Sequence, residues 1–324
     1  MKRIVLLALV LAAAIGATAS YATAPGKNGR IAFRRYFDKD HNWGAVFTVN
    51  ANGTGERQVT HPPKGTNDDQ PDWSPDGSLL AFSRCPKDKA CAVYTVHPDG
   101  SGLTQVSKPC PPSGKVPPCT DDYLASFSPD GKELVFKQFS GNKKNGRGQN
   151  IVIADLRTGE QRVAVYGAKG YTQLDPQFSP NGKRLVFTHV VEPTERKRAL
   201  FVANVNGTGM RRVTPWNLHA GDNPDWSPDG KWILFHSYED VQSKQAQIYL
   251  IHPNGTGLKQ LTHFKNGSIV TSSSFSPDGK WIVFGGEGVD GNADLFVMRP
   301  NGSGQHPITR TKLWDSAPDW GPTP

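Results

Sequence analysis

One short pattern recurs along this 324-residue chain and limits its possible folds more than any other feature. The pattern is an aromatic residue followed by Ser-Pro, then Asp or Asn, then Gly, and an alternating apolar run ending in Phe comes after each copy. The copies are Trp73–Gly77, Phe127–Gly131, Phe178–Gly182, Trp226–Gly230 and Phe275–Gly279. Their glycines, together with Gly29 of a similar Asn-Gly turn, are 48, 54, 51, 48 and 49 residues apart, which indicates six repeat units.

A second element repeats in step with the first, namely a strand, a glycine turn and a short strand. Its copies span residues 46–60, 93–107, 201–214, 248–262 and 295–309, and a divergent copy spans 151–166. Each unit therefore holds four short alternating strands, and 34 Gly and 26 Pro residues fit a chain that turns often. Four strands in about 50 residues are typical of a propeller blade. The aromatic residues of the first pattern occupy one repeat position, so we expect them to pack between blades rather than to bind a ligand.

The two ends of the repeat region predict how the ring closes. The first unit lacks its innermost strand, whereas the C-terminal segment around Trp320 matches the start of a unit and then stops. A final strand that completes the first blade would leave no open sheet edge. We therefore predict an all-β fold over residues 25–324, a closed six-bladed propeller of four-stranded blades whose C-terminal strand completes the first blade.

The N-terminus has the features of an export signal. Lys2 and Arg3 precede the uncharged apolar run Ile4–Ile15, and small residues follow. Residues 1–24 are predicted to be a signal peptide cleaved after Ala19, Ala22 or Ala24, or alternatively retained as an anchor. The mature protein would then have no transmembrane segment and would be periplasmic or extracellular.

All four cysteines lie within 35 residues, at positions 85, 91, 110 and 119. An even number of cysteines in an exported chain favours disulfides. We predict the pairs Cys85–Cys91 and Cys110–Cys119, because each closes a short loop; zinc is the alternative, but the cysteines lack the close pairs that zinc sites use.

The repeats resemble those of TolB-type propellers, which are similar to WD repeats. The resemblance rests on the Trp/Phe-Ser-Pro-Asp-Gly-Lys turn, the following Ile/Val-x-Phe strand and the Asn-Gly-Thr-Gly hairpin, and it covers residues 25–324. It implies a propeller that can hold a calcium ion in its channel. Propellers serve unrelated functions, so the resemblance is specific for the fold rather than for an activity.

One face of the ring is predicted to carry the binding site. The Ser-Pro-Asp-Gly and Asn-Gly-Thr-Gly turns would lie on one face, the turn face, and the longer connectors on the opposite, upper face, which we call the loop-rich face. Acidic residues precede the innermost strands and would surround the channel mouth there; they are Asp68, Asp69, Asp121, Asp122, Asp175, Asp222 and Asp315. Carboxylates suit a hard cation, so Asp68, Asp122, Asp222 and Asp315 are candidate calcium ligands, although caps for loop amides are the alternative role. No cofactor is required.

Basic residues on the same connectors suggest the kind of partner. Lys64, Lys115, Lys144, Arg196, Lys265, Arg310 and Lys312 are among them. A basic rim could attract an acidic protein or an anionic polysaccharide, although solvated surface charge is the simpler explanation. Nucleic acid is not expected for an exported chain, and we expect a monomer.

Little in the sequence indicates catalysis. No Gly-x-Ser-x-Gly or His-Glu-x-x-His motif occurs. We therefore expect a non-catalytic scaffold that binds a protein or other ligand on its loop-rich face. The alternative is a metal-dependent polysaccharide lyase of the oligogalacturonate-lyase type, because His61, His219 and His263 fall on upper connectors and could form a metal site with Asp222. Convergence of the three histidines would favour the lyase.

Overall fold

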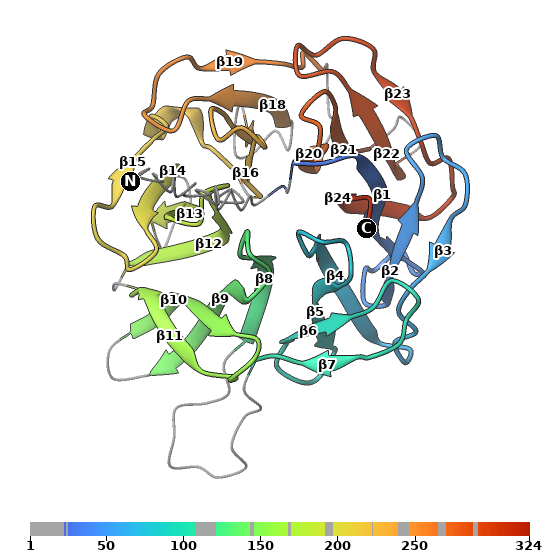
Figure 1. Cartoon of the computed structure of the whole chain (residues 1–324), viewed down its shortest axis with the longest axis horizontal. Coiled ribbons are helices and arrows are strands. Elements are labelled where there is room, and N and C mark those ends of the chain that lie inside the picture. The colour runs from blue at the N-terminus through green and yellow to red at the C-terminus, as the bar shows by residue number, and fades with distance from the viewer. Residues whose placement is uncertain are drawn as a thin grey trace, which may run out of the picture.

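The computed structural model shows antiparallel sheets arranged in a ring around a central axis (Figure 1). It describes residues 23, 25–107, 121–142, 146–167, 170–191, 197–221, 223–238, 246–264, 270–287 and 291–324. The predicted signal peptide therefore lies outside the described residues except for Thr23. Within the described ranges, no helix is long and apolar enough to cross a membrane.

Four of the sheets have four strands each, with the first strand of each sheet nearest the axis (Figure 1). One consists of β8 (Asp121–Phe127), β9 (Glu133–Asn142), β10 (Gly146–Asp155) and β11 (Gln161–Val165). The next consists of β12 (Tyr171–Phe178), β13 (Arg184–Val191), β14 (Lys197–Asn204) and β15 (Arg211–Arg212). After the 3-10 helix η1 (Trp216–Leu218) come β16 (Asp225–Trp226), β17 (Ile233–Tyr238), β18 (Ala246–Ile251) and β19 (Lys259–Gln260). The last consists of β20 (Val270–Phe275), β21 (Ile282–Glu287), β22 (Ala293–Met298) and β23 (His306–Pro307).

The remaining strands form one sheet of eight, so the prediction of a ring of six separate four-stranded blades was wrong. This sheet contains β24 (Trp314–Pro322), β1 (Asn28–Tyr36), β2 (Gly44–Val49), β3 (Arg57–Gln58), β4 (Thr66–Trp73), β5 (Leu80–Pro86), β6 (Ala92–Val96) and β7 (Thr104–Gln105). A single parallel pair, Gly44 with Asn67, joins β2 to β4. The backbones can approach because Gly44 has no side chain, since a Cβ there would lie 2.6 Å from Asn67 Oδ1. Gly44 lies outside the repeated motifs, which therefore did not predict the joined sheet.

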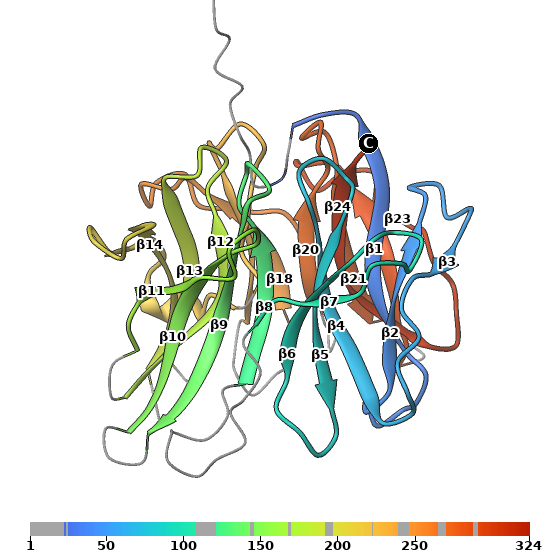
Figure 2. The same cartoon turned by 60° about the horizontal axis from the view of Figure 1, so that its bottom comes forward.

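The C-terminal strand pairs with the first strand, as predicted. β24 is antiparallel to β1, with Ile31 opposite Trp320 and Arg35 opposite Asp315. The two ends of the repeat region are thus joined by a ladder of backbone hydrogen bonds, which covers strand edges that would otherwise be open (Figure 2).

The Ser-Pro-Asp-Gly segments form tight turns, as their residue types predict. In the first copy, Ser74 Oγ donates to Asp76 Oδ1 at 2.7 Å and accepts a hydrogen bond from Leu79 N at 2.8 Å. Gly77 has a φ of 70°, in the left-handed region that glycine tolerates best. The side chains of this turn are therefore used to hold the turn itself.

The repeated aromatic residue packs between neighbouring sheets, which confirms its predicted role. Trp226 of β16 is 2% exposed and contacts the cluster that contains Val186, Leu200 and Val202 of the preceding sheet. The equivalents lie in corresponding clusters; they are Trp73, Phe127, Phe178, Phe275 and Trp320. The core of the protein is therefore the series of apolar layers between sheets.

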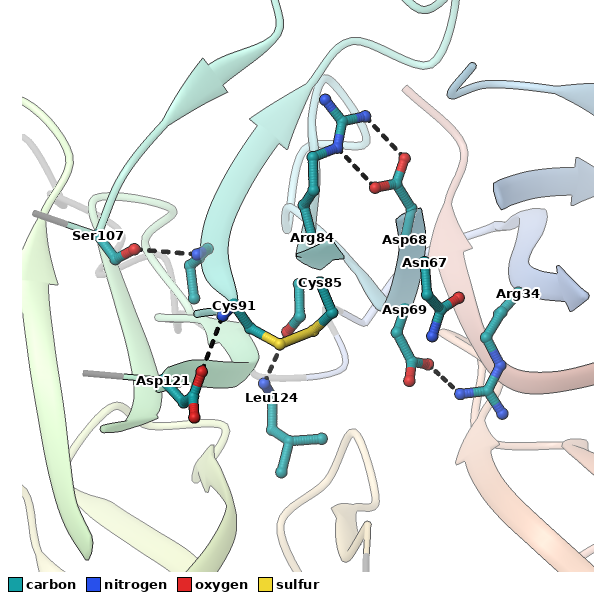
Figure 3. Close-up of a disulfide and its surroundings, with 12 residues drawn as sticks. Arg34, Asn67, Asp68, Asp69, Arg84, Cys85, Cys91, Ser107, Asp121 and Leu124 are labelled. Atoms are coloured by element: carbon teal, nitrogen blue, oxygen red, sulfur yellow. Dashed lines mark hydrogen bonds and ion pairs between the residues drawn. A yellow bond between two sulfur atoms is a disulfide. The ribbon is translucent and has the colours of Figure 1, made fainter. Parts of the chain in front are cut away.

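One of the two predicted disulfides is present. Cys85 and Cys91 are bonded across the hairpin between β5 and β6 (Figure 3). The amide of Cys91 donates to Asp121 Oδ1 at 2.9 Å, which ties this hairpin to β8 of the next sheet. The predicted pair Cys110–Cys119 lies outside the described residues.

Replacing Cys91 with alanine is expected to lower the free energy of unfolding by about 2 kcal/mol, because the disulfide closes a short loop in the unfolded chain. Urea unfolding of the variant and of the wild type, both in oxidising buffer, would measure the difference. A loss above about 4 kcal/mol would exceed what the entropy of the unfolded chain explains, and would mean that the folded hairpin also depends on the bond.

Candidate functional site

The innermost strands enclose a polar cavity on the axis of the ring. The residues that line it come from equivalent positions just before the repeated aromatic residue; among them are Asp72, Ser126, Gln177, Ser274 and Asp319. Because side chains alternate along a strand, the aromatic residue faces a neighbouring sheet while the polar residue before it faces the axis. A central channel with polar walls follows directly from the repeat.

Three aspartates at this position each connect one inner strand to the inner strand that follows it around the ring. Asp72 accepts a hydrogen bond from Phe127 N at 2.8 Å, and Asp225 accepts one from Phe275 N at 2.7 Å. Asp319 accepts a hydrogen bond from Trp73 N at 2.7 Å. We did not predict these residues as a site, although the repeated Pro-Asp-Trp sequence was the signal that could have identified them.

The three carboxyl groups are arranged so that their ionisation is unfavourable. Burial raises the pKa of Asp225 to about 7, and the nearby Asp319 adds to the increase. Burial also raises the pKa of Asp72 and of Asp319, and repulsion from Asp319 contributes at Asp72. A cation at this position would relieve the repulsion.

Strained backbone positions the polar residues of the channel. Gln70, Leu124 and Ala317 have φ values of 53°, 60° and 52°, which are uncommon for residues with a side chain. The pairing of β4 with β5 and of β8 with β9 shifts register at these points. Such bulges change the direction of the side chains that follow, so the strain lies where the chain turns its polar groups toward the axis.

The predicted acidic residues at the loop-rich mouth bind arginines. Arg84 donates to both carboxylate oxygens of Asp68 at 2.7 Å, and Arg34 forms an ion pair with Asp69 (Figure 3). Asp68 is completely buried. A buried carboxylate needs such a partner to remain charged.

Asp315 is also paired. It accepts two hydrogen bonds from Arg35, at 2.6 Å from Nε and 2.8 Å from Nη2, and Arg35 also binds Glu56. Burial raises the pKa of Asp315, and the hydrogen bonds from Arg35 oppose that increase. Arg35 and Asp315 lie opposite each other on β1 and β24, so this ion pair spans the closure of the ring.

The other predicted mouth residues that the structure describes each have surroundings of their own. Asp122 is 1% exposed on β8, and Asp175 Oδ2 accepts a hydrogen bond from Asn223 N at 2.9 Å. Asp121 binds the amide of Cys91, as an amide cap would. Asp222 lies outside the described residues.

The contacts of the predicted calcium ligands do not fit a calcium site. Two of the four candidates, Asp68 and Asp315, already use both carboxylate oxygens on guanidinium groups. In the part of the chain that is described, no group of three or more His, Cys, Asp or Glu side chains could hold a metal ion. We derive no calcium chemistry from these residues.

Aromatic and basic side chains form a cluster at the same mouth. The rings of Tyr36 and His41 stack with 4.3 Å between centroids, and His41 lies 4.8 Å from Trp314. The Arg34 guanidinium lies 4.3 Å from the Tyr36 ring centroid. Partial burial of the imidazole and the nearby Arg34 lower the pKa of His41. We call Arg34, Tyr36, His41 and Trp314 the mouth cluster.

The three histidines proposed for a lyase site belong to different parts of the ring. His61 follows β3, His219 ends η1 before β16, and His263 follows β19. They do not form a metal-binding group within the described residues. The convergence that would have favoured the lyase is therefore not found among them.

Antiparallel sheets arranged radially around a polar channel, with their inner strands facing the axis, define a β-propeller. The sequence matches the model of the TolB beta propeller domain over residues 123–323, which is more than half of the chain. The chain belongs to this family.

The curated proteins that match this chain by sequence include a peptidase and a lyase. It is 27% identical over 180 residues to the uncharacterized peptidase YuxL of Bacillus subtilis, covering 49% of this chain and 27% of the relative. It is 26% identical over 196 residues to an oligogalacturonide lyase of Pectobacterium atrosepticum, covering 56% of this chain and 48% of the lyase. Each match therefore spans less than half of the relative.

The crystal structure of TolB from Acinetobacter baumannii is similar to the fold described above. It has a TM-score of 0.70 and 19% identity, and the match covers 94% of this chain and 69% of that chain. At this identity the likeness concerns the fold alone.

Proposed function

We propose that the protein is exported and acts as a non-catalytic scaffold that binds a partner protein on its loop-rich face. The mouth cluster is the observation that carries the proposal. His41 is exposed and lies near the buried Arg34, and Trp314 is half-buried beside His41. Aromatic residues and arginine held on a rigid scaffold are the residue types that dominate the affinity of protein interfaces.

The surroundings of the mouth cluster favour an acidic partner. Lys64, Arg310 and Lys312 are exposed near the start of β4 and β24. The neighbouring carboxylates Asp68 and Asp315 are neutralised by their arginines. Asp38 and Asp40 lie near His41 and offset part of the positive charge, and the exposed cations Lys64, Arg310 and Lys312 would steer an acidic protein segment to the cluster.

Replacing Trp314 with alanine is expected to lower the affinity for the partner at least tenfold, because truncation of an interface aromatic commonly has this effect. A photo-crosslinking amino acid at position 41 in the exported protein would first capture the partner, and titration of that partner would then give the affinities. Leu258, which is 45% exposed in a hairpin of the turn face, is the matched control position.

Equal crosslinking at positions 41 and 258, or an unchanged affinity of the Trp314→Ala variant, would contradict the proposal. An anionic polysaccharide that competes for the mouth cluster would replace the protein as the ligand.

The alternative is a lyase of the oligogalacturonate type, which the sequence match to the Pectobacterium lyase favours. Incubation of the purified protein with oligogalacturonate and a divalent metal tests it directly. Formation of unsaturated products that disappears in a His219→Ala variant would make the protein an enzyme.

A further inference from the structure

Thr23 lies at the turn-face end of the channel, although it falls inside the predicted signal region. Its side chain is buried, with the residue 7% exposed, and Oγ1 donates to Asp225 Oδ1 at 3.2 Å and Oδ2 at 3.3 Å. Thr23 is therefore packed against the ring at Asp225 of β16.

The segment that follows Thr23 is fixed to the turn face. Gly26 N donates to Pro277 O at 3.2 Å, and Asp278 N donates to Asn28 Oδ1 at 3.0 Å. Thr323 N donates to Lys27 O at 2.9 Å. These contacts hold the start of β1 against the Ser-Pro-Asp-Gly turn after β20 and against the C-terminal strand.

The channel contains polar groups that a cation could contact. None of the ion pairs among the described residues involves Asp72, Asp225 or Asp319. The hydroxyls of Ser272 and Ser273 line the same cavity, are 3% and 4% exposed, and have no hydrogen-bond partner in the described structure. Asp72 and Asp319 line this cavity with the two serines, and Asp225, which binds Thr23, lies near Asp319. Such groups suit a positively charged group that donates hydrogen bonds.

We propose that the precursor is cleaved between Ala22 and Thr23, and that the new α-ammonium group of Thr23 binds at the channel end beside Asp225. The proposal rests on export, which is part of the proposed function. Water hydrolyses the Ala22–Thr23 peptide bond: its oxygen joins the Ala22 carbonyl carbon to give a carboxylate, and the Thr23 nitrogen leaves protonated as an ammonium group. The residues Ser20-Tyr21-Ala22 supply the small side chains that a signal peptidase needs at the third and first positions before the cut.

The covalent geometry of threonine places the two charges close together. The α-nitrogen and Oγ1 of one residue are at most about 4 Å apart, and Oγ1 is hydrogen-bonded to the carboxylate. The ammonium is thus within about 7 Å of Asp225, beside a side chain that is buried. Opposite charges attract more strongly in a buried position than at the surface. Cleavage after Ala24 would remove Thr23, and cleavage after Ala19 would leave three residues in front of it.

The first experiment identifies the cleavage position. The full precursor is produced in a bacterial host with export, and the N-terminus of the purified protein is determined by intact mass and Edman sequencing. A chain of residues 23–324 is the expected result. A chain that starts at Ser20 or Pro25 would overturn this inference while leaving export intact, whereas an uncleaved chain retained in the cytoplasm would overturn the export proposal as well.

The second experiment tests the ammonium group itself. Protein beginning at Thr23 is compared with protein carrying Ala22 in front of it, both released from a fusion by a protease that leaves no extra residues. The form beginning at Thr23 is expected to have a Tm higher by about 2–4 °C, and the Asp225→Asn substitution should abolish this difference. Asp319→Asn, which changes a channel carboxyl group without a hydrogen bond to Thr23, should preserve it. Equal Tm values for the two forms, or a difference that persists in Asp225→Asn, would overturn the assignment.

Discussion

Replacing Arg35 with alanine is expected to lower the free energy of unfolding by about 3–5 kcal/mol. The Arg35 side chain is 8% exposed and neutralises Asp315, which is completely buried. Without the guanidinium, the carboxylate is left unpaired inside the protein at the junction of β1 and β24. Urea unfolding followed by tryptophan fluorescence measures the change.

Two comparisons test this explanation for Arg35. Lys132 and Asp130 form an ion pair in which both side chains are exposed, so Lys132→Ala should change stability by less than about 1 kcal/mol. The double variant Arg35→Leu/Asp315→Leu should be more stable than Arg35→Ala, because no unpaired charge remains buried. A loss below about 1 kcal/mol for Arg35→Ala would mean that the backbone ladder closes the ring without help from the ion pair.

Replacing Trp226 with alanine is also expected to cost about 3–5 kcal/mol, because the indole fills the apolar layer between two sheets. Trp226 is 2% exposed, and its Nε1 has no hydrogen-bond partner among the described residues. The contribution of Trp226 to stability therefore comes from packing alone. Thermal or urea unfolding of the purified variant measures the loss.

The repeat supplies the matched control for Trp226. Phenylalanine occupies the equivalent position at Phe127, Phe178 and Phe275, so Trp226→Phe should cost less than about 1.5 kcal/mol. If Trp226→Phe were as damaging as Trp226→Ala, the site would require the indole for a contact that the apolar cluster does not explain.

Much of the fold could be predicted from the repeats, because strand alternation and turn chemistry act over a few residues. The Ser-Pro-Asp-Gly turns, the packing role of the aromatic position and the pairing of the last strand with the first were predicted from these patterns. The pair Cys85–Cys91 was predicted from the short loop that it closes. The joined eight-stranded sheet was not predicted, because it depends on one close approach at Gly44.

The candidate site was predicted less well, because its side chains meet across long sequence separations. The sequence predicted acidic residues at the starts of the inner strands. Those that the structure describes lie on these strands. Their partners Arg34, Arg35 and Arg84 are outside the repeated motifs, so nothing in the repeats indicated that Asp68, Asp69 and Asp315 are occupied by guanidinium groups.

The sequence by itself determined the repeating strands, their turns and the residue type that faces each layer, since these follow from local backbone preferences and from the period of two along a strand. Only the tertiary structure decided which charges neutralise each other and what lies at the end of the channel. Arg35 and Asp315 are 280 positions apart, and Thr23 and Asp225 are 202 positions apart. Ring closure brings such residues together, and the cost of burying a charge then requires each to have a partner.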